Sequence, residues 1–129
     1  MLSPAAIVEE FGEQWIRSNL RHVMPQPGVV PNGPLVELTS IGVHEKHQGQ
    51  GYASRALRML TTLCDENAMT IKLIARPIES DRLPGCPATL STEQLVAWYQ
   101  EHGFVENGAA GDDTREMIRA PRMQPFTNL

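Results

Sequence analysis

A change of hydrophobic period at Gly51 constrains the possible folds more than any other feature of the sequence. Within LVELTSIGVH, before that point, residues 38–43 are rich in β-branched and aliphatic side chains, which predicts a strand. After Gly51 the apolar residues recur every three or four positions, which predicts an amphipathic helix. Apolar residues then alternate over TIKLIAR, residues 70–76, which predicts a second strand. Strand, helix and strand form a βαβ unit, so we expect two parallel strands joined by a right-handed crossover.

The segments around this unit complete an α/β chain with a mixed sheet. Ser3 followed by Pro4 predicts the start of an N-terminal helix. The breaker-rich stretch PQPGVVPNGP, residues 25–34, indicates a linker. Ser91 and Gly103 are expected to begin and end a third helix, and FVENGAAGDDTREMIR after it predicts a hairpin. The expected order of elements is therefore α-β-α-β-α-β-β.

Composition and charge restrict the class of protein. A chain of 129 residues with 41% hydrophobic and 20% charged residues is typical of one globular domain. A net charge of −4 argues against a nucleic-acid partner, because phosphate binding needs a basic surface. No apolar run approaches the roughly 20 residues of a membrane span, and no signal-peptide pattern begins the chain, so we expect a cytoplasmic protein without a membrane partner. Cys64 and Cys86 fit no zinc spacing, and we expect Cys64 in the core.

The stretch HQGQGYASRAL, residues 47–57, places Gly49 and Gly51 at the junction of strand and helix. A glycine-rich turn that leads into a helix can direct several backbone N–H groups at one anion, and the helix N-terminus adds about half a positive charge. The stretch lacks both the G-K-[ST] of a nucleoside-triphosphate loop and the third glycine of a dinucleotide fingerprint. The alternatives are a tight turn that needs positive φ, or a nucleotide-binding regulator with the same turn. These residues suggest a phosphate-bearing ligand without specifying which.

At this junction the chain resembles the GNAT superfamily of acyl-CoA-dependent N-acetyltransferases. Gln48, Gly51 and Ala53 match the family pattern [QR]-x-x-G-x-[GA], and LVAWYQEHGF is similar to the family's later helix-then-strand motif. The ending REMIR is similar to the last strand of many members. The resemblance covers residues 36–119 and implies a GNAT-like fold with an abbreviated N-terminal half.

The resemblance also implies a single GNAT-like domain over residues 1–129. Its expected parts are an N-terminal helix (1–24), a linker (25–34), an acyl-CoA-binding core (35–120) and a tail (121–129). Members usually have further strands before the signature strand, and the loop over residues 77–91 is longer than their usual link. Part of the sheet is then missing, rearranged or supplied by a partner subunit, and a homodimer would cover the exposed sheet edge.

Acetyl-CoA as cosubstrate, and no metal, follow from the same resemblance. The strand with Ile41 and Val43 would splay from the next parallel strand to admit the pantetheine arm, which the Val43 backbone would bind. The pyrophosphate would be held by the turn that comprises Gln48, Gly49, Gln50, Gly51, Tyr52 and Ala53. Thr92 stands where many members have an asparagine that contacts the cofactor. His44 and His47 could form a metal pair, but the spacing places no third ligand.

The implied chemistry is direct attack of a primary amine on the acetyl thioester. Tyr99 occupies the position of the family's general acid, the alternative being a tyrosine that packs its ring under the sheet. Glu37 is the candidate base, the alternatives being a solvated carboxylate at that position and His44 as the base. We expect an N-acetyltransferase for a small amine or a protein amine. The alternative is a catalytically weak or inactive GNAT-fold protein that binds a protein partner.

Overall fold

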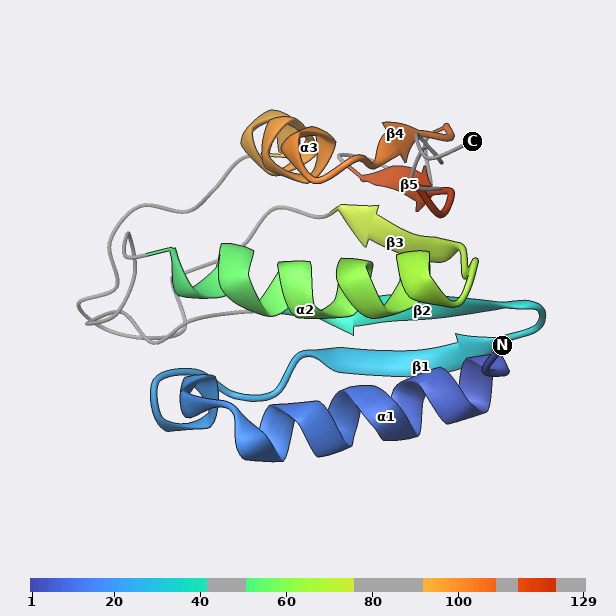
Figure 1. The fold of residues 1–129 in the computed structure, drawn as a ribbon. Coiled ribbons are helices and arrows are strands. Elements are labelled where there is room, and N and C mark those ends of the chain that lie inside the picture. Colours follow the sequence, from blue (N-terminus) through green and yellow to red (C-terminus); the bar gives the residue numbers. More distant parts are fainter. Residues whose placement is uncertain (42–50, 76–91, 109–113, 123–129) are drawn as a thin grey trace, which may run out of the picture.

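The computed structural model describes residues 1–41, 51–75, 92–108 and 114–122 (Figure 1). In chain order the elements are α1 (Pro4–Arg17), the 3₁₀ helix η1 (Asn19–His22), β1 (Gly28–Asn32), β2 (Leu35–Ser40), α2 (Tyr52–Glu66), β3 (Ile71–Ala75), α3 (Thr92–Glu101), β4 (Val105–Glu106) and β5 (Arg115–Arg119). In Figure 1, α2 runs along the sheet with α1 beside it, and α3 lies towards the edge formed by β4 and β5.

The strands form a five-stranded sheet in the order β1-β2-β3-β5-β4. β2 and β3 are parallel, and the other neighbouring pairs are antiparallel. This arrangement confirms the mixed sheet, the βαβ unit through α2 and the C-terminal hairpin that the sequence predicts.

The expectation of a linker over residues 25–34 is wrong, because β1 occupies half of that stretch. β1 pairs with β2 through a turn at Gly33, which has a left-handed φ of +60°. β1 also contains Pro31, which an edge strand tolerates because its outer side needs no ladder hydrogen bond. The observed order of elements therefore contains one more strand than the expected order.

One face of the sheet is buried beneath the helices, and the other carries both charged and aliphatic side chains. Because successive side chains of a strand alternate between faces, Leu38 and Leu73 are buried while Glu37 and Lys72 lie opposite. α1 packs against β1, β2 and α2, and its buried residues join the core. They are Ile7, Phe11 and Trp15. Cys64 of α2 is fully buried, as expected from the sequence, and burial raises the pKa of its thiol to about 12.

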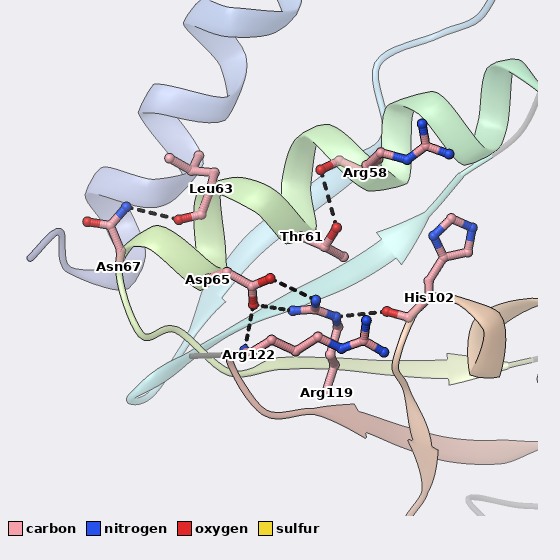
Figure 2. A network of polar contacts seen from close by, with 8 residues as sticks. All are labelled: Arg58, Thr61, Leu63, Asp65, Asn67, His102, Arg119 and Arg122. Atoms are coloured by element: carbon pink, nitrogen blue, oxygen red, sulfur yellow. Dashed lines mark hydrogen bonds and ion pairs between the residues drawn. The ribbon is translucent and has the colours of Figure 1, made fainter. Parts of the chain in front are cut away.

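A charged cluster joins α2, β5 and the turn that follows α3 (Figure 2). Arg119 is only 3% exposed, and its guanidinium binds both carboxylate oxygens of Asp65 at 2.6 and 2.9 Å. Its Nε also donates to the carbonyl of His102 at 2.8 Å. The backbone N–H of Arg122 donates to the same Asp65 carboxylate at 2.8 Å. One carboxylate and one guanidinium therefore hold together three segments that are far apart in sequence.

These contacts set the ionisation of Asp65. Partial burial acts to raise the pKa of this carboxyl, but the hydrogen bonds from Arg119 and Arg122 and their charges outweigh it, so that the pKa is lowered. The folded-state pKa therefore lies below the unfolded value of about 3.9. The stabilisation from this carboxylate is present above the unfolded pKa and is lost as the pH falls through the folded one.

We predict that Asp65→Asn lowers the free energy of unfolding by about 3 kcal/mol at pH 7, because it leaves a buried guanidinium without its counter-charge. Urea unfolding at pH 7 and at decreasing pH measures the effect, which should shrink below pH ~4 as the wild-type carboxylate protonates. Glu116→Gln is the control, because its ion pair with Lys72 is more exposed (3.3 Å, side chains 28% and 26% exposed). An equal loss for the two variants, or a pH-independent loss for Asp65→Asn, would contradict the account.

Candidate acyl-CoA-binding site

The parallel pairing of β2 with β3 stops partway along both strands. Its last register pair is Leu38 with Leu73. Beyond this pair β2 continues to Ser40, which still pairs with β1, and β3 continues to Ala75, which pairs with β5. The facing edges of the two strands thus have no ladder with each other there, within the described residues. Backbone N–H and C=O groups on such edges need partners other than the neighbouring strand.

A bulge in the β1–β2 pairing lies next to this point. Gly28 pairs with Ser40 and Val29 with Leu38, so that Thr39 is an extra residue on β2. A bulge bends its strand and increases the local twist. Glycine fits opposite it without adjustment, because a Cβ at Gly28 would overlap the Thr39 hydroxyl and lie 2.6 Å from Ser40 Oγ, so that both exposed hydroxyls would have to rotate. The sequence predicts neither feature, because it places Gly28 in a linker and Thr39 in a strand whose register it does not show.

Helix α2 begins at the same end of the βαβ unit without a side-chain cap. Gly51 is its N-cap residue and has a left-handed φ of +80°, and its carbonyl accepts the first helical hydrogen bond from Arg55 at 3.0 Å. A Cβ at Gly51 would meet no atom within 4 Å, so that the conformation rather than crowding favours glycine there. A helix start of this kind, with an open approach and no cap, is suited to an anion.

The other residues expected to bind the cofactor are only partly described. Tyr52 and Ala53 lie half-buried in the first turn of α2, and the Arg55 guanidinium lies 5.9 Å from the centroid of the Tyr52 ring. Ile41, directly after β2, is half-buried against the core, and Thr92 is buried at the start of α3. The remaining expected contacts lie outside the described residues; they are Val43, Gln48, Gly49 and Gln50. The two histidines of the candidate metal pair, His44 and His47, also lie outside them.

Tyr99 is buried in the core that α3 shares with β2 and β3. It is 7% exposed, and its ring lies between Trp98, at 5.0 Å between centroids, and Phe104, at 5.6 Å in an edge arrangement. Burial raises the pKa of Tyr99 to about 12, so that the phenol stays protonated at neutral pH. The helix ends as predicted before Gly103 (φ +94°), where the Phe104 N–H donates to the Tyr99 carbonyl at 3.2 Å.

Trp98 joins α3, which carries Tyr99, to the start of α2. It is half-buried, and its indole N–H donates to Ser54 Oγ in the first turn of α2 at 3.1 Å. Trp98 lies in the LVAWYQEHGF motif, but no pattern in the sequence pairs it with Ser54. A tryptophan N–H that needs a partner is visible in the sequence, but the partner is 44 positions away and becomes known only from the fold.

Glu37 lies on the sheet face opposite the core that contains Tyr99. It is half-buried, its Oε1 accepts a hydrogen bond from Asn32 Nδ2 at 2.9 Å, and its neighbour in register is Lys72. The structure thus places this carboxylate one residue before the end of the β2–β3 pairing and does not bring it into contact with Tyr99. Its role as a base stays a prediction.

No group of three or more His, Cys, Asp and Glu side chains in the described ranges could hold a metal ion. No helix among those residues has the length and apolar character needed to cross a membrane.

Comparison with known proteins identifies the family. The sequence profile described as "Acetyltransferase (GNAT) family" matches residues 19–104, well over half of the chain, so the chain belongs to the GNAT acetyltransferase family. No curated protein matches the sequence.

Solved structures resemble the fold. The ribosomal-protein-S18-alanine N-acetyltransferase from Escherichia coli matches with a TM-score of 0.51 and 16% identity, over 78% of this chain and 63% of that one. Ard1 from Thermoplasma volcanium matches with a TM-score of 0.48 and 18% identity, over 73% of this chain and 62% of that one. At such low identities the likeness concerns the fold alone. The chain spans less than two thirds of the length of either structure.

We predict that Tyr99 stays protonated far into the alkaline range. NMR of ring-labelled tyrosine gives signals for the two tyrosines of the chain, and the one that Tyr99→Phe removes is Tyr99. Because burial raises its pKa to about 12, this signal should keep its phenol position to at least about pH 11. A titration midpoint near 10, the value of an unperturbed phenol, would contradict this environment.

Proposed function

We propose that the chain is an N-acetyltransferase that moves an acetyl group from acetyl-CoA to a primary amine. The observation that carries this proposal is the end of the β2–β3 pairing beside the uncapped start of α2. An acyl-CoA carries a pantetheine arm with amide groups next to a pyrophosphate. The strand edges beyond the end of the pairing would bind the amides, and the start of α2 would bind the pyrophosphate. Membership in the GNAT acetyltransferase family supports the same ligand.

The cofactor would lie along these two features. The pantetheine arm would bind the β2 edge from Ile41 to Val43, and the pyrophosphate would bind the turn from Gln48 to Ala53. Thr92 would contact the cofactor from the start of α3. No side-chain cation is required for the pyrophosphate, because backbone N–H groups and the helix dipole supply the positive potential.

In the reaction the amine nitrogen attacks the thioester carbonyl carbon, and the carbon–sulfur bond then breaks. The amine loses one proton to a base, and the departing thiolate gains one from an acid. Tyr99 is the proposed acid, since a phenol held neutral by burial keeps its proton until the thiolate forms in the same low-dielectric site. Glu37 is the proposed base and would act through water, with His44 as the other candidate. The products are an acetylated amine and CoA.

The acceptor and the assembly are also proposals. The acceptor is a small-molecule or protein primary amine, and the protein would act in the cytoplasm. A homodimer would cover the outer edge of β1, which is the last strand of the described sheet on that side.

We predict that Tyr99→Phe lowers kcat at least 100-fold with a panel of primary amines and leaves the KM for acetyl-CoA nearly unchanged, because only the proton donor is lost. Thiol release from acetyl-CoA measures the rate. The thermal midpoint of Tyr99→Phe should stay close to that of the wild type, since its ring contacts remain.

Glu37→Gln in the same assay tests the base and should lower kcat without weakening acetyl-CoA binding. An unchanged kcat in Tyr99→Phe would overturn the assignment of the acid. A folded wild type that binds acetyl-CoA and acetylates none of the amines would favour the alternative, a GNAT-fold protein that acts by binding a protein partner.

A further inference from the structure

Helix α3 is attached to α2 at two points by polar contacts. At one point the Trp98 indole N–H donates to Ser54 Oγ at 3.1 Å, in the first turn of α2. At the other point the carbonyl of His102 accepts from Arg119, whose guanidinium is bound to Asp65 in the last turn of α2. The two attachments lie on either side of Tyr99 in the sequence.

The ring of Tyr99 is held by the residues that make these attachments. Trp98 contacts it directly, with 5.0 Å between the ring centroids, and also contacts His102 with an edge arrangement at 5.1 Å. The N–H groups of His102 and Phe104 both donate to the Tyr99 carbonyl, at 2.9 and 3.2 Å. A shift of Trp98 or of the turn after α3 therefore moves Tyr99.

We propose that Ser54 and Trp98 are positioning residues: their hydrogen bond fixes Tyr99 relative to the start of α2. The inference rests on the proposed function, in which the start of α2 holds the pyrophosphate and Tyr99 protonates the sulfur. These two groups belong to one extended ligand, so that their separation must match its length. A misplacement of about 1 Å at a reacting group can reduce the rate by about 100-fold.

The chemistry of Ser54 suits this role. A hydroxyl can accept one hydrogen bond and donate another at the same time. Ser54 Oγ accepts from the Trp98 indole N–H. As a neutral acceptor, it joins the first turn of α2 to α3 without a charge.

The two attachments are unequal, which allows a clean test. The Arg119–Asp65 contact is charged and its guanidinium is buried, so that breaking it affects folding. The Ser54–Trp98 contact is a single neutral hydrogen bond between half-buried residues, so that breaking it affects stability little. The second contact can therefore be removed from a protein that stays folded.

The test compares Ser54→Ala, Trp98→Phe and the double variant. We expect each single variant to lower kcat about tenfold, with little change in the thermal midpoint, and the double variant to be no slower than the worse single variant. Such non-additivity is the mark of two residues that act through one contact. Thr62→Ala is the matched control, because it removes an exposed hydroxyl from the same helix and should leave kcat unchanged.

A second readout does not depend on turnover. The NMR signal of Tyr99 should shift in Ser54→Ala, although Ser54 and Tyr99 are on different helices, and should stay in place in Thr62→Ala. Independent, multiplying losses in the double variant would overturn the inference, as would an unmoved Tyr99 signal in Ser54→Ala. A wild type that neither binds nor uses acetyl-CoA overturns the proposed function instead, and the Tyr99 signal then still decides whether the contact positions this ring.

Discussion

The early end of the parallel pairing between β2 and β3 is the constraint on which the site depends. Two parallel strands joined by a helix can pair along their whole length, but here the pairing ends at Leu38, next to a bulge at Thr39 that bends its strand. Beyond Leu38 and Leu73 the described edges of β2 and β3 do not pair with each other. This end of the βαβ unit is also where α2 begins, so the parallel ladder ends on the same side of the unit as the N-terminus of α2.

The second requirement is that α3, whose Leu95, Val96 and Tyr99 are buried in the core, be held in a fixed position on α2. Two polar contacts do this: Arg119 with Asp65 and the His102 carbonyl, and Trp98 with Ser54. The charged contact stabilises the fold, whereas the neutral one lies next to the candidate site. Stability and positioning are therefore assigned to different ends of α2, where Asp65 and Ser54 lie, and substitutions can examine them separately.

The sequence predicts those parts of the molecule that local patterns control. The change of period at Gly51 predicts the βαβ unit, and the left-handed glycine before Phe104 ends α3 as expected. The strand β1 was missed because its two valines lie among prolines and glycines, and only pairing with β2 makes them a strand. The bulge and the Trp98–Ser54 contact depend on register and on packing between distant segments, which no local pattern contains. The same limit applies to Glu37, whose sheet face is known only once the register is known.

The central claim is that the start of α2 binds the pyrophosphate of an acyl-CoA. The most direct measurement is calorimetric titration of acetyl-CoA into the wild type, Gly51→Asp and Gly33→Asp. Both glycines have positive φ, +80° and +60°, and open space at the Cβ position, but Gly33 lies in the β1–β2 turn, at the opposite end of the sheet in Figure 1. Aspartate tolerates this conformation, so both variants should fold, and only the carboxylate at position 51 would repel the pyrophosphate. The account predicts binding by the wild type and by Gly33→Asp and none by Gly51→Asp; equal binding by all three proteins would contradict it.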